Sequence, residues 1–267
     1  MAASGATTTY TYDDGSQLLS AGTTTYTYDQ AGNRLTAGTD EFSWDDLGRL
    51  ESATVDGTTT TYTVDGDGRR VAATSGGTTT PYLWDIAAPL AELVGAGSAA
   101  YLHANGMLLA ERDATSTAYP LADALGSIRA MTDAAGAVTG SASYDTFGER
   151  TSSGTGSIFG FSGEQTDPTG LVYLRARYLD PASGTFLSVD PVRPGAPGAV
   201  GYNPYTYVGN NPTTWTDPTG TFAEMSISYT PSRLSIPPLA VLGRQIARML
   251  ILIGVPLGAL AGYRRGR

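Results

Sequence analysis

The side chains that could carry chemistry in this chain are few in kind. Its 267 residues include no cysteine and one histidine, His103, and all 16 basic residues are arginines. The lack of cysteine excludes disulfides, thiolate metal ligands and cysteine nucleophiles, and a lone histidine outside a ligand cluster is rarely a metal ligand. We therefore interpret His103 as a structural or loop residue and expect no metal and no cofactor. Any catalysis must use carboxylates, arginines or hydroxyls.

The most regular of these groups are aspartates that recur along the first third of the chain. In YTYDQAGNRL (26–35), Asp29 follows two tyrosines and precedes a glycine and Arg34. Asp29 and Arg34 are close enough to form an ion pair across this turn, or Asp29 could cap backbone amides there. An exposed ion pair contributes only about 0–1 kcal/mol. The same interpretation covers the aspartates at intervals of 16, 16, 20 and 20 residues, which are Asp13, Asp29, Asp45, Asp65 and Asp85.

The residues around these aspartates predict strands joined by tight turns. Alternation of Tyr26, Thr27 and Tyr28 is typical of a half-buried strand, and the residues around Gly32 tolerate the positive φ that reverses a chain. Each repeat is therefore predicted to be one hairpin, and successive hairpins bury a continuous apolar face. A composition with 34 glycines, 16 tyrosines and 15% charged residues agrees with mainly β structure. Trp44, Trp84 and the repeat tyrosines are expected in the core or on a sheet face, with sugar stacking as the alternative.

Charge is distributed unevenly between the body and the end of the chain. Residues 221–267 contain six arginines and one acid, a net charge of +5, whereas the first 220 residues carry 10 basic and 24 acidic groups, a net charge of −14. An acidic body repels phosphates, so we expect no nucleic-acid partner. The first residues lack the charged and apolar regions of a secretory signal. We expect a fragment of a longer polypeptide, or a protein exported as part of one.

Three further segments carry a family resemblance. These are YPLADALGSIRAMTDAAGAVTGSASYDTFGER (119–150), TGLVYLRARYLDPASGTFLSVDP (169–191) and NPYTYVGNNPTTWTDPTG (203–220). Together with the hairpin repeats, they resemble the YD repeats and associated core of the RHS family, which also occur in the C components of bacterial Tc toxins and in teneurins. The resemblance implies an antiparallel β-sheet that spirals into a hollow shell around a C-terminal polypeptide, typically a toxin, with the core region as a plug. Because this chain has few repeats, we expect part of the wall plus the plug.

The resemblance also implies a domain organisation and a set of partners. It divides the chain into a hairpin array (1–118), a core or plug (119–220) and a variable tail (221–267). The expected function is to enclose and release the chain's own C-terminal tail as cargo, in a secreted or cell-surface setting within a larger bacterial polypeptide. Other expected partners are upstream secretion or toxin components and a target-cell membrane or its glycans. The alternatives are a non-catalytic module that binds cell-surface carbohydrate or protein, and an inactive remnant.

The resemblance further implies a self-cleaving site near the end of the core. Self-cleaving members resemble aspartic proteases, and the two Asp-Pro aspartates that match theirs are Asp190 and Asp217. In such a dyad one carboxyl keeps a proton while the other activates water. The chain would act once, on itself, and the expected cleavage region consists of Gly220, Thr221 and Phe222.

Several features of this region leave its interpretation open. Arg193 stands where the family usually has glycine, and Thr221 stands where it favours leucine. Both Asp-Pro pairs are equally compatible with simple turns in which aspartate bonds local amides. In YLRARYLD (173–180), a single strand would place Arg175 and Arg177 on one face. We expect these arginines to neutralise nearby carboxylates and, secondarily, to support catalysis.

The tail has a different composition from the body. A run without charge extends from Met249 to Tyr263, too short by itself for the ~20 residues that cross a bilayer core. We expect residues 239–263 to form a helix that lies at a membrane interface or self-associates there. The alternative is a buried helix packed against the inside of the sheet.

Overall fold

The structure is a computed structural model that describes residues 7–88, 90–104, 106–192, 203–221 and 223–225. Strands dominate these residues, as the sequence predicted. Helix in the described part is confined to two short 3-10 segments, η1 (Phe161–Gly163) and η2 (Val208–Asn210). The tail from residue 226 onward, with the helix predicted over 239–263, lies outside the described residues. Among the described residues, none belongs to a helix long and apolar enough to cross a membrane.

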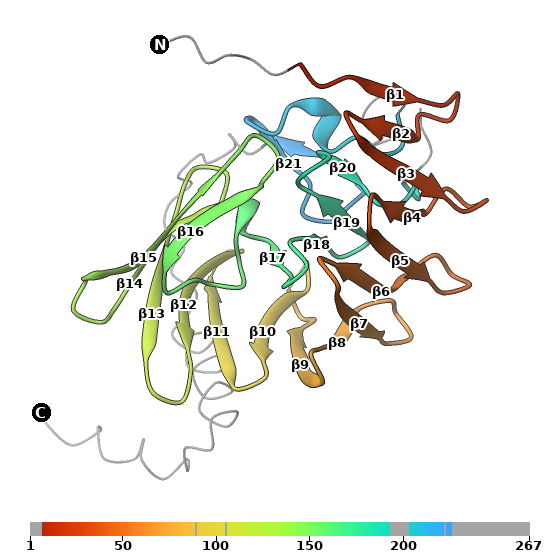
Figure 1. Cartoon of the computed structure of the whole chain (residues 1–267). Helices are drawn as coiled ribbons and strands as arrows, with labels where there is room; N and C mark the ends of the chain where they lie inside the picture. The colour runs from red at the N-terminus through yellow and green to blue at the C-terminus, as the bar shows by residue number, and fades with distance from the viewer. Residues whose placement is uncertain (1–6, 89, 105, 193–202, 222, 226–267) are drawn as a thin grey trace, which may run out of the picture.

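Sixteen strands form one sheet in which each strand pairs with the next along the chain, in the order β1 to β16. This order is that of successive antiparallel hairpins, and Figure 1 shows the sheet curving around the shorter strands that follow it. The strands are β1 (Tyr10–Tyr12), β2 (Leu18–Ala21), β3 (Thr24–Tyr28), β4 (Arg34–Ala37), β5 (Asp40–Trp44), β6 (Leu50–Val55), β7 (Thr58–Val64), β8 (Arg70–Ser75), β9 (Thr78–Asp85), β10 (Glu92–Ala96), β11 (Ala99–Ala104), β12 (Met107–Arg112), β13 (Thr117–Ala122), β14 (Ile128–Thr132), β15 (Val138–Tyr144) and β16 (Arg150–Gly154). The sheet continues past residue 118, where the hairpin array was expected to give way to the core.

Two smaller sheets lie inside this curve. One contains β17 (Gln165–Thr166), β18 (Val172–Leu174), β19 (Arg177–Asp180) and β20 (Thr185–Phe186), and the other contains β21 (Trp215–Thr216) and β22 (Glu224–Met225). The prediction of one strand over 173–180 is wrong. Leu174 pairs with Arg177 across a tight turn in which Arg175 has a φ of 64°. The left-handed backbone at Arg175 reverses the chain, although no glycine or asparagine marks the turn.

The turn of each repeat has the predicted hairpin geometry. Asp29 Oδ1 accepts hydrogen bonds from the backbone amides of Ala31 at 2.9 Å and Asn33 at 2.8 Å, and Gly32 has a φ of 85°. Asp45 and Asp65 accept the equivalent two amides in their own turns. The aspartates therefore cap backbone amides. Asp45 and Asp65 also form ion pairs across their turns, with Arg49 at 2.6 Å and Arg69 at 3.1 Å, so both alternatives drawn from the sequence occur there.

The ion pair expected between Asp29 and Arg34 is wrong. The side chain of Arg34 is fully buried and its Nη1 donates to Asp180 Oδ2 of β19 at 2.7 Å. Arg70 likewise points inward and pairs with Asp167 at 2.6 Å, with both side chains almost inaccessible. The residue five positions after the repeat aspartate thus faces the inner strands. This position holds, in successive repeats, Leu18, Arg34, Leu50 and Arg70.

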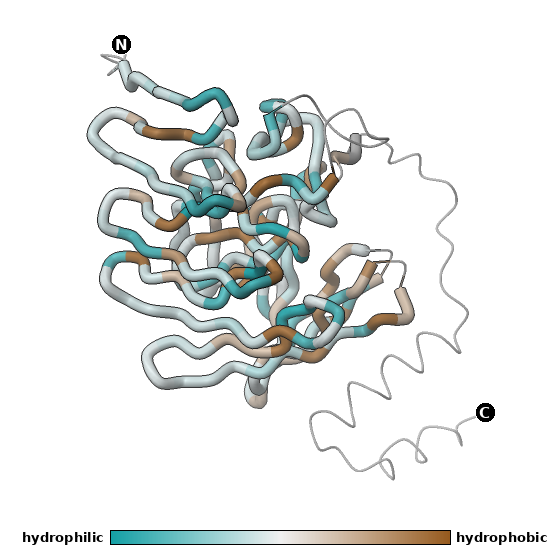
Figure 2. The backbone as a smooth tube through the Cα atoms, turned by 90° about the vertical axis from the view of Figure 1, so that its right-hand side faces the viewer, coloured by the Kyte–Doolittle hydropathy of each residue, from teal (hydrophilic) through white to brown (hydrophobic). Residues whose placement is uncertain are grey.

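The core lies between the concave face of the large sheet and the inner strands. One cluster joins Phe42, Leu50 and Tyr62 of the repeats to Tyr173 and Tyr178 of the inner sheet. In Figure 2 the hairpin tips are pale or teal, and the hydrophobic segments lie nearer the inner strands. The inner strands therefore complete the core of the repeats.

The tryptophans contribute to this contact as core or sheet-face residues, as predicted. Trp44 Nε1 donates to the backbone carbonyl of Arg34 at 2.8 Å, and Trp84 Nε1 donates to that of Arg70 at 2.7 Å. Tyr26 is buried as well, whereas Tyr10 at the edge of the sheet is half exposed. The inward rings are not available for stacking on sugars.

Candidate functional site

The two Asp-Pro aspartates predicted as a dyad are brought together by one arginine. Arg177 Nη2 lies 2.8 Å from Asp190 Oδ2 and 3.5 Å from Asp217 Oδ2. The side chains of Arg177 and Asp217 are each 3% exposed, and that of Asp190 is 17% exposed. The predicted role of Arg177 in neutralising nearby carboxylates is therefore correct. Its guanidinium also stacks on the ring of Phe186, with 3.6 Å between the guanidinium carbon and the ring centroid.

Each aspartate uses its second oxygen in a local turn. Asp190 Oδ1 accepts the Val192 amide at 2.8 Å, and Asp217 Oδ1 accepts the Thr221 amide at 3.1 Å. The turn at Asp217 repeats the geometry of the hairpin repeats, with Gly220 at a φ of 72°. The turn interpretation is therefore correct, and it leaves one oxygen of each carboxylate directed at Arg177.

The Gly220–Thr221 peptide bond is contacted on both sides by this group. Arg177 Nε donates to the Gly220 carbonyl oxygen, and Asp217 Oδ1 accepts the Thr221 amide. A cation at the carbonyl oxygen favours charge that develops there during attack by a nucleophile. A carboxyl group next to the amide nitrogen is placed to exchange a proton with it. Of the predicted cleavage region, Gly220 and Thr221 thus lie in the site, and Phe222 lies outside the described residues.

The β18–β19 turn contacts three consecutive carbonyls of the C-terminal turn. Arg175 Nη1 donates to the Pro218 carbonyl, the Ala176 amide donates to the Thr219 carbonyl at 3.2 Å, and Arg177 donates to the Gly220 carbonyl. A Cβ atom at Gly220 would lie 2.4 Å from the Leu174 carbonyl oxygen. The segment from 218 to 220 therefore fits against the hairpin turn only with glycine at its last position.

Burial and charge act in opposite directions on the ionisable groups of the site. Desolvation raises the pKa of Asp190 above its ordinary value, although the nearby Arg177 favours the ionised form. Desolvation likewise lowers the pKa of Arg177, against the pull of both aspartates. A carboxylate whose pKa is raised by burial is a stronger base than an exposed one, and a proton acceptor at this site needs that property.

Glu164 belongs to the site but was not predicted. Its Oε2 accepts a hydrogen bond from Arg175 Nη1 at 2.8 Å, the same nitrogen that contacts the Pro218 carbonyl. Burial raises the pKa of Glu164 to about 7, and Arg175 opposes the shift. The predicted neutralising role of Arg175 is correct, but its partner follows a 3-10 turn with no motif in the sequence.

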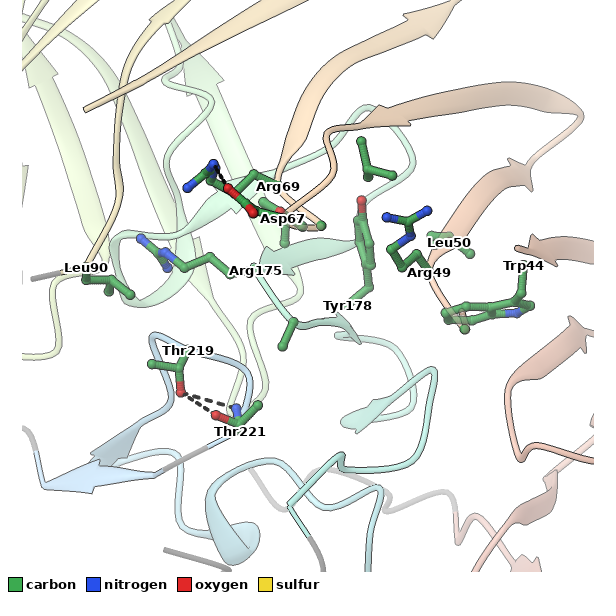
Figure 3. Close-up of a pocket in the computed structure, with 15 residues that line it drawn as sticks. Trp44, Arg49, Leu50, Asp67, Arg69, Leu90, Arg175, Tyr178, Thr219 and Thr221 are labelled. Atoms are coloured by element: carbon green, nitrogen blue, oxygen red, sulfur yellow. Dashed lines mark hydrogen bonds and ion pairs between the residues drawn. The ribbon is translucent and has the colours of Figure 1, made fainter. Parts of the chain in front are cut away.

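A pocket of about 430 Å³ borders the site. Figure 3 shows Thr219 and Thr221 of the C-terminal turn and Arg175 of the hairpin turn around it, facing Arg49 and Arg69 of the repeats. The lining combines apolar side chains with these hydroxyl and guanidinium groups, and the volume is large enough to hold water. Water can therefore lie close to the turn that contains the Gly220–Thr221 bond.

The remaining candidate residues lie elsewhere in the fold. His103 is buried in β11 against Phe159, with 5.6 Å between ring centroids, and burial lowers its pKa to about 4. A neutral, buried imidazole agrees with the structural role expected for it. The described part of the chain contains no group of three or more acidic or histidine side chains arranged to hold a metal ion.

Comparison with known proteins assigns the family. The teneurin YD-shell family model matches residues 1–213. The chain belongs to this YD-shell family. Among curated relatives, it is 30% identical over 174 residues to the tRNA3(Ser)-specific nuclease WapA of Bacillus spizizenii, covering 62% of this chain and 7% of that protein. It is 46% identical over 61 residues to toxin subunit YenC2 of Yersinia entomophaga, covering 22% of this chain and 6% of the subunit.

Solved structures of Tc toxins have the same fold as this YD-shell chain. The crystal structure of TcdB2-TccC3 has a TM-score of 0.55 at 20% identity, over 80% of this chain and 13% of that one. The Tc holotoxin pore of Photorhabdus luminescens gives a TM-score of 0.54 at 20% identity, over 82% of this chain and 14% of that one. The chain thus spans a small fraction of the length of the proteins that it resembles. The predicted shell fragment in the RHS/YD-repeat family is confirmed.

Proposed function

We propose that this chain is a section of a YD shell that encloses the polypeptide following its core and releases it by hydrolysing the Gly220–Thr221 peptide bond. The observation that carries the proposal is the placement of this bond, with Arg177 on its carbonyl oxygen, Asp217 on its amide and Asp190 on the same guanidinium. Because the substrate is part of the same fold, proximity supplies much of the rate enhancement.

In the proposed reaction, Asp190 takes a proton from a water molecule whose oxygen attacks the Gly220 carbonyl carbon. The negative charge that forms on the carbonyl oxygen is stabilised by Arg177. The Thr221 nitrogen becomes basic in this tetrahedral intermediate and takes a proton from the protonated carboxyl of Asp217 as the carbon–nitrogen bond breaks. The products are a carboxylic acid at Gly220, which passes its proton to the amine freed at Thr221, and the proton gained by Asp190 returns to Asp217 through solvent.

The sequence of the turn at Asp217 does not by itself support this proposal, because the same sequence forms a second turn in different surroundings. DPTG occurs at 167–170 and again at 217–220. Asp167 directs its Oδ2 to Arg70 in the core, whereas Asp217 lies at an arginine that also contacts a peptide carbonyl and a second carboxylate. The difference lies in the tertiary surroundings of the two turns.

Intact mass of the purified 267-residue protein tests the proposal. We expect two products, ending at Gly220 and starting at Thr221, after incubation at mildly acidic to neutral pH. Asp190→Asn and Asp217→Asn should each leave one species, because either change removes a proton acceptor or donor. Asp133→Asn is the matched control, since Asp133 caps Ala135 and Ala137 in an exposed repeat turn. A wild-type protein that stays intact, or aspartate variants that still cleave, would refute the reaction.

The wider setting is part of the same proposal. Toxin subunits among the relatives support a role with toxin components, in a secreted or cell-surface protein, with the chain's own C-terminal tail as the cargo. The Tc structures support only the assignment of the fold. The tRNA nuclease activity is named for WapA relatives of whose length the shared segment spans at most 7%.

A further inference from the structure

Arg175 links Glu164 to the turn that contains the candidate cleavage bond. Its Nη1 donates both to Glu164 Oε2 and to the Pro218 carbonyl, and its Nη2 donates to the Ala91 carbonyl at 3.4 Å. Pro218 immediately follows Asp217 in the chain. This guanidinium therefore helps to fix the position of the Asp217 carboxylate.

The backbone does not keep Arg175 in place without help. Its φ of 64° lies in the left-handed region, which is unfavourable for a residue with a side chain. Such a conformation persists only where surrounding contacts hold the residue in place. Within the described residues, Glu164 is the acid that forms an ion pair with Arg175, and it is itself buried.

We propose that Glu164 is a positioning residue for self-cleavage, whose ion pair with Arg175 keeps the guanidinium on the Pro218 carbonyl and the Asp217–Thr221 turn against the β18–β19 hairpin. This inference rests on the proposed function. Glu164 acts through Arg175 and takes no part in the proton transfers. Loss of its negative charge leaves the hydrogen-bonding shape of the site but weakens the contact that fixes Arg175.

The charge on Glu164 changes near neutral pH. The groups that act on it are Arg175 of the hairpin turn, which favours the carboxylate, and Asp217 of the C-terminal turn, which opposes it. Tyr207, next to η2, also faces Glu164. Since the pKa of Glu164 is about 7, Glu164 is ionised and paired with Arg175 at higher pH and becomes neutral at lower pH.

The test is the pH profile of cleavage in Glu164→Gln. Glutamine resembles the protonated acid, so the variant should cleave roughly tenfold more slowly than wild type at pH about 8.5. The two rates should converge at pH about 5.5, where Glu164 of the wild type is itself neutral. Glu149→Gln, the same change at an exposed position in a repeat turn, should follow the wild type at both values.

A second measurement does not depend on cleavage. In the Asp190→Asn background, which is expected to stay intact, Glu164→Gln should speed hydrogen exchange at the amides of Ala176 and Thr221. The Ala176 amide donates to the Thr219 carbonyl and the Thr221 amide donates to Asp217, so both report on the contact between the C-terminal turn and the β18–β19 hairpin. Exchange in the β5–β6 hairpin should not change, and Glu149→Gln should change neither.

Each other outcome has a defined meaning. Equal cleavage by Glu164→Gln and wild type at both pH values, with Asp190→Asn inactive, overturns the positioning role and leaves the proposed function intact. A rate lowered by the same factor at both pH values indicates a general folding defect and also overturns the positioning role. A wild type that does not cleave at either pH removes the proposed function, and this inference with it.

Discussion

Replacing Arg70 by leucine should be among the most damaging single changes to this fold. Arg70 has a side-chain exposure of 0% and Asp167 of 1%, and the two are 2.6 Å apart. Removing one partner of such a buried pair leaves an uncompensated charge, which costs about 3–5 kcal/mol. The Arg70 guanidinium also lies 4.1 Å from the ring centroid of Tyr173. Leucine is a suitable replacement because the equivalent position of the preceding repeat is Leu50, buried in the same core.

Urea unfolding followed by tryptophan fluorescence measures the effect. Arg69→Leu is the matched control, because Arg69 and Asp65 form an ion pair with side-chain exposures of 32% and 30%, and exposed pairs contribute about 0–1 kcal/mol. The double variant Arg70→Leu/Asp167→Leu should recover most of the loss, since it removes both charges. A loss for Arg70→Leu no larger than that for Arg69→Leu would refute the reasoning, and so would a double variant less stable than the single one.

Two further predictions concern the candidate site. Gly220→Ala should displace the C-terminal turn and abolish cleavage, because its Cβ would lie 2.4 Å from the Leu174 carbonyl oxygen. In the other DPTG turn, the Cβ of Gly170→Ala meets nothing within 4 Å, so this control should lose only the stability that alanine costs at a φ of 80°. Intact mass compares cleavage of the two variants, and unfolding midpoints compare their stability. Because burial raises the pKa of Glu164 from 4.5 to about 7, the folded state binds its proton more tightly than the unfolded state does. The contribution of Glu164 to the free energy of unfolding should therefore fall as pH rises from 4.5 to about 7. Glu164→Gln should flatten that part of the stability profile measured in the Asp190→Asn background, relative to Glu149→Gln, and an unchanged profile would contradict the assignment.

The amino-acid sequence by itself determined the local structure of the repeats. Tyr26 and Tyr28 alternate with threonine, Asp29 can reach two amides of its own turn, and Gly32 accepts a positive φ, so all the interactions of the hairpin lie within about ten residues. Such short-range chemistry can be recognised from composition and spacing. The candidate site was found at Asp190 and Asp217 because the Asp-Pro segments resemble those of a known family, and their role in cleavage stays a prediction.

Tertiary structure decided which charged groups meet. Arg34 was expected to face Asp29, five residues away, but its partner is Asp180, 146 residues further along the chain. Arg175 and Arg177 were placed on one strand, whereas a left-handed residue makes a hairpin there, and Glu164 had no motif at all. A surface ion pair contributes little, whereas a charge inside the curved sheet has to be compensated. The partners of Arg34, Arg70 and Arg177 were therefore set by which residues the inner strands bring against the concave face.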